Sequence, residues 1–206
     1  MTISGQRIYL ASRSPRRREL LKQIGIAYEV LLFRENPERG VDVDETPVPV
    51  ESPREYVQRI ARTKAEHGWF CVTQRGLPRF PVLAADTAVV LGERIMGKPA
   101  DRDGAIEMLT ALSGQEHEVL TAVAVAFGER LEMRLSLSTV RFKTLRIEEI
   151  RRYVASGEPF DKAGAYAIQG HAAAFAAHLS GSFSGVMGLP LFETAELLAE
   201  FGIGSP

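Results

Sequence analysis

The chain has 206 residues, of which 45% are hydrophobic and 25% are charged, with a formal net charge of -1 and a single cysteine, Cys71. This near-neutral balance argues against proteins that coat nucleic acid or adhere to membrane surfaces through charge. One cysteine excludes an intrachain disulfide, and neither a signal-peptide pattern nor an apolar run of ~18–20 residues is present, so we expect a cytoplasmic protein with no nucleic-acid or membrane partner.

Strand and helix patterns alternate along the chain, which favours an α/β fold. The clearest helix starts are Ser14 before Pro15, and a capping box of Ser52 and Glu55 around Pro53. The expected elements of the first half are a strand at 7–12, a helix at 15–24, a strand at 28–33, a loop at 34–51, a helix at 52–67 and a strand at 81–91 that turns at 92–93. They are followed by a helix at 101–112, a hairpin of strands at 117–127 and 131–145, and a helix at 146–156. The last part is expected to contain a glycine-rich turn region at 157–170, a strand near 172–179, a Gly- and Ser-rich turn at 180–190 and a helix at 190–201. We expect one domain, residues 1–206, with two lobes and a cleft between them.

Three arginines, Arg16, Arg17 and Arg18, fill the first turn of the first predicted helix, where the helix dipole disfavours each positive charge by ~0.3–1 kcal/mol. Helix periodicity places Arg16 and Arg17 on the face that carries Leu20 and directs Arg18 to solvent. Basic side chains beside unpaired backbone N–H groups form an anion site, and we favour a phosphate chain as the anion. A solvated basic turn is the alternative.

Asp86 is a carboxylate inside an otherwise apolar strand pattern. Its burial requires a cation, a metal ion or a water molecule that it activates, unless it lies at a strand end and bonds to a turn. Lys64 falls on the apolar stripe of its helix, where it either faces a site or extends past the core to solvent. Glu45 is a second carboxylate that could join Asp86 around a divalent cation, and Asp42 and Asp44 are its neighbouring alternatives.

Other catalytic motifs are incomplete. Gly92, Gly97 and Lys98 have the spacing of a phosphate-binding P-loop, but Pro99 stands where Ser or Thr should hold Mg²⁺. The P-loop is therefore rejected, which disfavours a kinase, and Lys98 is kept as a candidate phosphate contact. No His or Cys spacing indicates zinc, and no G-x-S-x-G motif predicts a serine hydrolase.

Six stretches of the sequence resemble, in order, the motif blocks of the Maf family: LASRSPRRRELL, EYVQRIARTKA, AADTAVVLGERIMGKP, LSGQEHEVLTAVAV, DKAGAYAIQG and GSFSGVMGLPLFET. The resemblance covers nearly the whole chain. It implies a nucleoside triphosphate pyrophosphatase, a two-lobed α/β fold shared with inosine triphosphate pyrophosphatases, a divalent metal (Mg²⁺ or Mn²⁺) and a homodimer. DKAGAYAIQG is similar to the branch that acts on dTTP and UTP, including base-modified uridine triphosphates.

The resemblance also implies roles for individual residues. Asp86 matches the catalytic base, and Glu45 matches the acidic residue before the second helix. In the mechanism that we expect, these two carboxylates hold the divalent metal. The positions that match the substrate-binding set are Ser12, Arg17, Lys64 and Lys98 for the phosphates, and Arg16, Thr87 and Gln169 for base selectivity.

Together these roles predict a reaction in which cations take up the charge that develops on the leaving pyrophosphate, while Asp86 accepts a proton from the water that attacks the α-phosphorus. The amide of Gln169 offers both a donor and an acceptor to a uracil or thymine edge. Two rivals remain: a 7-methyl-GTP pyrophosphatase of the same family, and a non-catalytic regulator of cell division, which the family's older name, septum formation inhibitor, suggests.

Overall fold

The structure is a computed structural model that describes residues 7–33 and 42–204. None of the helices in these two ranges is long and apolar enough to cross a membrane. The elements in chain order are β1 (Arg7–Leu10), α1 (Pro15–Gln23), β2 (Ala27–Val30), α2 (Pro53–Gln74), β3 (Val82–Leu91), β4 (Arg94–Met96), α3 (Arg102–Leu112), β5 (Glu116–Phe127), β6 (Arg130–Phe142), α4 (Ile147–Ala155), two short 3-10 segments (Ala163–Ala165 and His171–Ala174), β7 (Ala176–Ser180), α5 (Phe183–Met187) and α6 (Leu191–Glu200).

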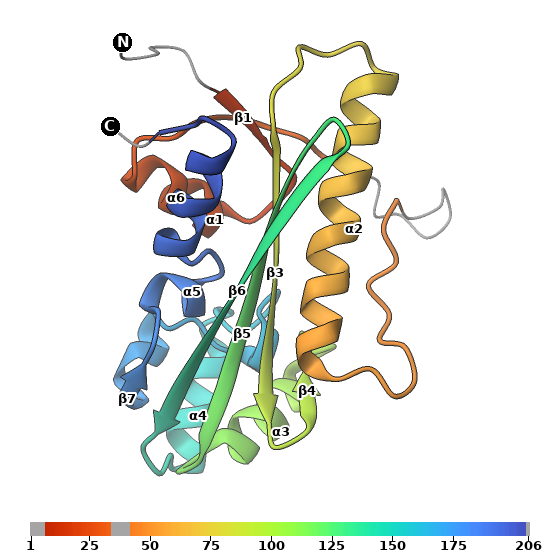
Figure 1. The fold of residues 1–206 in the computed structure, drawn as a ribbon. Coiled ribbons are helices and arrows are strands. Elements are labelled where there is room, and N and C mark those ends of the chain that lie inside the picture. Colours follow the sequence, from red (N-terminus) through yellow and green to blue (C-terminus); the bar gives the residue numbers. More distant parts are fainter. Residues whose placement is uncertain (1–6, 34–41, 205–206) are drawn as a thin grey trace.

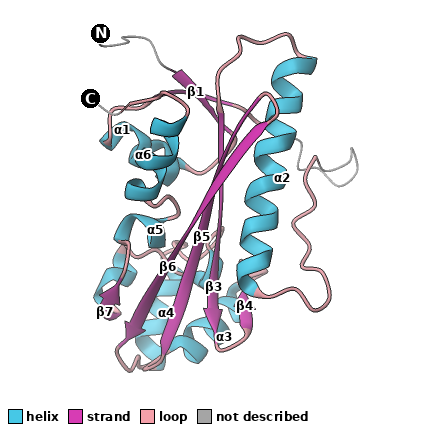
Figure 2. Ribbon diagram, viewed as in Figure 1, coloured by secondary structure: helices cyan, strands magenta, loops and turns pink. Residues whose placement is uncertain are grey.

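A single twisted sheet runs through the molecule (Figures 1 and 2), with strand order β2-β1-β3-β5-β6-β7 and β4 paired to β3. β1 is parallel to β2 and β3, whereas the other pairs are antiparallel, so the sheet is mixed. The long strands β3, β5 and β6 form its centre, with Asp86 opposite Ala122 and Ala122 opposite Leu135. The expected α/β class is confirmed.

The middle of β3 has a strand neighbour on one edge only. β1 pairs with β3 as far as Leu83, and β4 pairs with the same edge only from Val89 onward, whereas β5 covers the opposite edge along the whole interval. Within the described strands, residues 84–88 are therefore open on the side toward the end of β1. Asp86 lies in this interval, and the chain that leaves β1 enters α1 beside it.

Helices cover both faces of the sheet (Figure 1). α2 packs on one face, and α1, α5, α6, α3 and α4 lie on the other. Alternate residues of β3 follow this division, because successive side chains in a strand point to opposite faces. Ala84 and Ala88 belong to the core under α2, whereas Leu83, Ala85 and Val89 belong to the cores of the other face.

α2 extends to Gln74, beyond the expected end near residue 67. The glycine at position 68 is not a stop signal, because it lies inside the helix at its contact with the sheet. A Cβ at Gly68 would lie 2.6 Å from Cγ1 of Val82, so only glycine lets the helix approach β3 this closely.

Several expected boundaries differ from the structure. The turn expected at 180–190 contains the short helix α5, and the strand expected near 172–179 is a 3-10 segment followed by β7. The strands expected at 7–12, 28–33 and 131–145 end earlier, at Leu10, Val30 and Phe142. Much of the loop expected at 34–51 lies outside the described residues.

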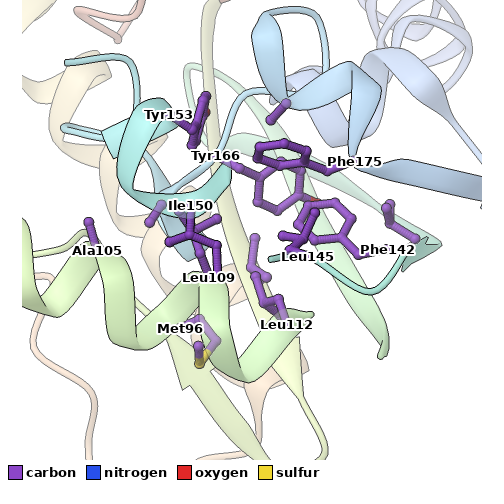
Figure 3. Packing of buried hydrophobic residues seen from close by; sticks show 14 of the residues in the cluster. Met96, Ala105, Leu109, Leu112, Phe142, Leu145, Ile150, Tyr153, Tyr166 and Phe175 are labelled. Atoms are coloured by element: carbon purple, nitrogen blue, oxygen red, sulfur yellow. The ribbon is translucent and has the colours of Figure 1, made fainter. Parts of the chain in front are cut away.

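An aromatic cluster fills the core between β5, β6, α3 and α4 (Figure 3). The rings of Phe142 and Tyr166 pack edge to face with centroids 4.9 Å apart. His117 lies against both rings, is 2% exposed, and has Nε2 2.9 Å from the hydroxyl oxygen of Tyr166. Its Nδ1 is buried without a hydrogen-bond partner among the described residues. Burial therefore lowers the pKa of His117 to about 4.

This buried imidazole makes stability depend on pH. Because the folded chain keeps His117 neutral while the unfolded chain protonates near pH 6.5, stability is fully present above pH 6.5 and is lost as pH falls toward about 4. The full loss is roughly 3 kcal/mol. Urea unfolding between pH 7.5 and pH 4 measures it. His117→Gln should flatten this part of the curve, whereas His178→Gln, at an exposed position, should leave it unchanged. A curve that His117→Gln leaves as steep as the wild-type curve contradicts the assignment.

Candidate active site

Three charged side chains meet beside the open interval of β3. Nζ of Lys64, on α2, lies 2.9 Å from Oδ1 of Asp86 and 2.7 Å from Oε1 of Glu45. The side chains of Lys64 and Asp86 are 13% and 11% exposed, whereas that of Glu45 is 49% exposed. Lys64 therefore does not extend past the core to solvent; it bridges a buried carboxylate to one at the surface.

The two carboxyl groups of this cluster have opposite pKa shifts. Burial raises the pKa of Asp86, and the ammonium of Lys64 with the guanidinium of Arg17 offsets only part of that rise. Burial also acts to raise the pKa of Glu45, but Lys64, Lys98 and Arg17 outweigh it, so the net pKa is below its ordinary value. The site thus holds one carboxyl with an increased proton affinity next to one that stays ionised, an arrangement typical of acid–base sites.

Of the three candidate acids in this loop, only Glu45 contacts Lys64, the residue that binds Asp86. Oδ2 of Asp42 lies 3.5 Å from Nε2 of His67, and Asp44 accepts a hydrogen bond from the backbone N–H of Thr46. The geometry therefore places Glu45 at the site and uses Asp42 and Asp44 elsewhere.

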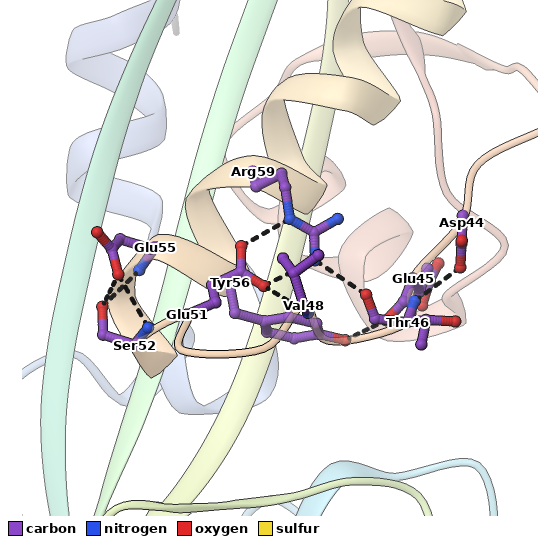
Figure 4. A network of polar contacts seen from close by, with 9 residues as sticks. All are labelled: Asp44, Glu45, Thr46, Val48, Glu51, Ser52, Glu55, Tyr56 and Arg59. Atoms are coloured by element: carbon purple, nitrogen blue, oxygen red, sulfur yellow. Dashed lines mark hydrogen bonds and ion pairs between the residues drawn. The ribbon is translucent and has the colours of Figure 1, made fainter.

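A network of side chains that the sequence patterns did not reveal holds the Glu45 loop (Figure 4). The hydroxyl of Tyr56 donates to the carbonyl of Glu45 at 3.0 Å. Arg59 donates to the carbonyl of Thr46 at 3.0 Å and to both oxygens of Glu51 at 2.6 and 2.8 Å. Burial, with the negative charges of Asp86 and Glu45, raises the pKa of Tyr56 to about 12, so this hydroxyl remains a donor. No local periodicity indicates such contacts, because they join residues of a loop to a helix.

Arg17 connects three segments on the opposite face of β3. Its guanidinium donates to the carbonyl of Gly188 at 2.7 Å, to the hydroxyl of Ser12 at 3.2 Å and to the hydroxyl of Thr87 at 3.3 Å. Thr87 in turn lies 3.0 Å from the hydroxyl of Thr121 on β5. Burial lowers the pKa of Arg17, and the charge of Asp86 opposes that shift. Asp86 and Thr87 are consecutive, so the sheet places the carboxylate cluster and the Arg17 cluster on its two faces.

Two backbone carbonyls at the end of α5 help to explain why arginines occupy the first turn of α1. Arg16 donates to the carbonyl of Met187 at 3.3 Å, next to the Gly188 carbonyl that Arg17 binds. The C-terminal end of a helix carries partial negative charge, which favours such cations. Ser14 makes no side-chain cap at α1, so its hydroxyl does not satisfy the first amides. Arg18, expected to face solvent, is half-buried, and its Nε is buried without a hydrogen-bond partner among the described residues.

Two predicted site residues stand apart from the carboxylate cluster. Lys98 is exposed, and its charge acts on Glu45 through space. Gln169 is exposed at the end of the loop that follows α4. Among the described residues, no hydrogen bond or ion pair joins either side chain to Asp86, Lys64 or Glu45. The fold therefore brings together Ser12, Arg16, Arg17, Thr87 and the Asp86 cluster, whereas Lys98 acts on Glu45 through charge alone and Gln169 makes no described contact with these residues.

The site offers limited ligands for a metal. In the described part of the chain, no group of three or more His, Cys, Asp or Glu side chains is arranged to hold an ion. Asp86 and Glu45 nevertheless converge on one cation, the ammonium of Lys64. Two carboxylates at one point fit Mg²⁺ or Mn²⁺, which commonly take one or two carboxylates and complete their coordination with water and substrate phosphates.

Comparison with known proteins gives consistent matches over the whole chain. Residues 7–201 match the family described as Maf-like protein. The chain is 62% identical over 203 residues to the dTTP/UTP pyrophosphatase of Nitrosomonas europaea, covering 98% of both chains. It is 58% identical over 198 residues to that of Aromatoleum aromaticum (95% of this chain, 96% of the relative), and 52% identical over 206 residues to that of Chromobacterium violaceum (100% of both).

The fold is also similar to that of a HAM1 protein from Coxiella burnetii. The TM-score is 0.50 and the identity 17%, over 95% of this chain and 99% of the other. At this identity the likeness shows the fold alone, and it agrees with the α/β architecture expected from the sequence.

The contact between Lys64 and Asp86 leads to a testable prediction about the pKa of Asp86. In Lys64→Met we expect the pKa of Asp86 to rise further, because the ammonium that lowers it is gone. Removing one partner of a buried ion pair also destabilises the fold, by about 3–5 kcal/mol. NMR titration of the Asp86 carboxyl carbon and urea unfolding measure the two effects.

Arg62→Met is the matched control, because Arg62 pairs with Glu66 on the same helix at 3.8 Å with both side chains exposed. We expect it to change stability by less than about 1 kcal/mol and to leave the Asp86 titration unchanged. An Asp86 titration that Lys64→Met does not move contradicts the role given to Lys64.

Proposed function

The chain belongs to the Maf family, and from this premise we propose that it hydrolyses dTTP and UTP to the nucleoside monophosphate and pyrophosphate. The observation that carries the proposal is the buried Asp86 carboxylate beside Lys64 and Glu45, in a chain 62% identical to a dTTP/UTP pyrophosphatase. The same reading includes base-modified uridine triphosphates among the substrates.

The cations of the site suit a triphosphate. Arg17 presents a fork of N–H donors that matches phosphate oxygens, and the hydroxyl of Ser12 lies beside it. Lys64 and Lys98 act on the other face of β3, where both already lower the pKa of Glu45. Positive charges fixed before the reaction stabilise the charge that grows on the leaving pyrophosphate. This role, together with the α5 carbonyls, accounts for arginines in the first turn of α1.

Asp86 acts as the general base in this proposal. Burial raises its pKa, so its carboxylate accepts a proton more readily than an exposed aspartate. Lys64 holds one carboxylate oxygen, Oδ1, and so fixes the orientation of the group. The proton that Asp86 removes comes from the water that attacks the α-phosphorus, and the bond from that phosphorus to the bridging oxygen breaks to release pyrophosphate.

We propose that Asp86 and Glu45 hold the divalent metal, Mg²⁺ or Mn²⁺. A bound ion of this kind neutralises phosphate charge and lowers the pKa of a coordinated water. The support from the chain is that both carboxylates already meet at one cationic group. Tyr56 and Arg59 keep the Glu45 loop in place, so that this carboxylate faces Asp86 before any ion binds.

Base selectivity belongs in this proposal to Arg16, Thr87 and Gln169. The hydroxyl of Thr87 accepts a hydrogen bond from Arg17 and contacts the hydroxyl of Thr121. Thr87 therefore orients Arg17, which binds phosphate in this proposal, at the point where the base site begins. Gln169 is exposed and its amide offers a donor and an acceptor to a uracil or thymine edge.

The family membership also supports three broader proposals. The chain acts as a homodimer, it works in the cytoplasm, and the nucleotide lies in a cleft between two lobes of one domain. Size-exclusion chromatography with light scattering tests the first of these directly.

The experiment that tests the function is product analysis with UTP, dTTP, GTP, 7-methyl-GTP and ITP, with Mg²⁺ or Mn²⁺ and with EDTA. Pyrophosphate from UTP and dTTP that disappears with EDTA supports the proposal. Pyrophosphate from 7-methyl-GTP alone would move the chain to the other branch of the family, and no pyrophosphate from any nucleotide would favour the non-catalytic regulator.

Asp86→Asn should keep the fold and lower kcat with UTP by ~10²–10⁴-fold, the usual contribution of a general base. Steady-state kinetics measures the loss, and the thermal midpoint reports the fold. Asp103→Asn, the same change at an exposed position on α3, is the control and should leave kcat unchanged. Full turnover by Asp86→Asn with the same metal dependence would remove Asp86 from the mechanism.

Gln169→Ala should alter the preference among bases. We expect kcat/KM for UTP to fall by ~10-fold or more while kcat/KM for CTP changes little. The reason is that the amide removed by the substitution contributes to binding only the base that it recognises. Competition assays with paired nucleotides give this ratio directly. Gln115→Ala, at another exposed glutamine, should keep the ratio. An equal loss on every nucleotide would argue against base recognition by Gln169.

A further inference from the structure

A carboxylate that no sequence motif singled out lies at the start of the loop that carries Gln169. Glu158 follows α4, and its side chain is 18% exposed. Its Oε1 accepts a hydrogen bond from the hydroxyl of Tyr153 at 3.0 Å. Its Oε2 accepts one from the backbone N–H of His171 at 3.1 Å and lies 2.8 Å from Nδ1 of the same residue. One nearly buried side chain therefore holds both a helix and the far end of the loop.

Tyr153 extends this contact to the other side of Gln169. Its hydroxyl oxygen accepts a hydrogen bond from the backbone N–H of Ala167 at 3.2 Å while donating to Glu158. Ala167 and His171 stand two residues before and two residues after Gln169. The backbone on both sides of Gln169 is thus fixed by one carboxylate, directly on one side and through a tyrosine on the other.

The loop needs such a support because its backbone is strained and has no strand pairing. Asp161 and Ala165 are non-glycine residues with φ of 67° and 59°, in the left-handed region. This conformation is unfavourable for residues with a side chain and persists only where the surroundings hold it. Gly164 donates to the carbonyl of Gly97, next to Lys98, so the same loop also touches the phosphate side of the site.

The side chain of Gln169 has no anchor of its own in the described part of the chain, where no hydrogen bond to its amide is found. Its direction is therefore set by the backbone at Ala167 to His171. A Cβ at position 170 would overlap with the Glu158 carboxylate, so Gly170 brings the backbone directly against that group. Displacements of about 1 Å are enough to break a recognition contact.

We propose that Glu158 is a positioning residue for base selectivity, which through Tyr153 and His171 fixes the backbone on both sides of Gln169 and so aims its amide at the uracil or thymine edge. This inference rests on the proposed function, because it gives Gln169 the base-reading role stated above. Glu158 does not touch the substrate; it acts only through Gln169.

The alternative is that Glu158 merely stabilises the lobe around α4. A purely structural group would change the thermal midpoint and the rates with all nucleotides alike. A positioning group changes the ratio of kcat/KM between UTP and CTP, and it does so through KM, because base contacts act equally on the bound substrate and the transition state.

The experiment compares the wild-type protein with Glu158→Gln and Tyr153→Phe. In Glu158→Gln an amide NH₂ replaces one acceptor oxygen, and it faces either the N–H of His171 or the hydroxyl of Tyr153. Tyr153→Phe removes one hydroxyl and remains informative if Glu158→Gln fails to fold. We expect the UTP-to-CTP ratio to fall by ~10-fold in Glu158→Gln and by a smaller factor in Tyr153→Phe, with kcat for UTP within about threefold of wild type.

The matched control is Glu149→Gln, the same substitution in the first turn of the preceding helix, where the carboxylate binds Lys143 and the backbone of Arg146. It should lower the thermal midpoint and leave the UTP-to-CTP ratio unchanged. The double variant Glu158→Gln/Gln169→Ala should have the ratio of Gln169→Ala alone, because two residues that act through one contact are not additive.

Three results overturn the inference. An unchanged ratio in both Glu158→Gln and Tyr153→Phe does so, and so does an additive effect in the double variant. A wild-type protein that releases no pyrophosphate from UTP contradicts the proposed function itself, and the Glu158 assignment falls with it. The wild-type control in the same assay therefore separates the two failures.

Discussion

The structure depends on one buried negative charge in the middle of β3. A carboxylate in an apolar strand is tolerated only where cations and hydrogen bonds compensate for its lost hydration. Lys64 supplies that compensation from α2, and Arg17 supplies part of it from α1 on the other face. Both helices must therefore meet the sheet where β3 lacks a second strand neighbour. The position of the buried charge, the interruption in strand pairing and the packing of α1 and α2 therefore depend on one another.

The same constraint separates the site into two clusters of side chains, one on each face of the sheet. Consecutive residues of a strand face opposite sides of the sheet, so Asp86 belongs to the carboxylate cluster under α2 while Thr87 belongs to the Arg17 cluster beside α5. On both faces, loops that carry proposed site residues are held by groups that do not touch the substrate in the proposed mechanism. Tyr56 and Arg59 fix the Glu45 loop on one face, and Glu158 with Tyr153 fixes the Gln169 loop on the other. Preorganisation of this kind is what gives fixed charges their catalytic effect.

The sequence predicted the parts of this arrangement that depend on local chemistry. Asp86 interrupts an apolar run, and Ser52 to Glu55 form a capping box that the structure contains as expected. Local patterns failed where packing between distant segments decides the outcome. Gly68 resembles a helix stop but is required by contact with Val82, and the Gly-rich run around α5 resembles a turn but forms a helix whose carbonyls bind Arg16 and Arg17. The contacts of Arg59 and Glu158 join loops to helices, so no spacing in the sequence indicates them.

In the proposed mechanism, Asp86 directs water to the α-phosphorus of a pyrimidine nucleoside triphosphate. Hydrolysis of UTP in water enriched in oxygen-18, with both products analysed by mass spectrometry, tests it most directly. Attack at the α-phosphorus puts one labelled oxygen in the uridine monophosphate and none in the pyrophosphate. Label in the pyrophosphate instead would place the attack at the β-phosphorus and contradict the geometry proposed for Asp86.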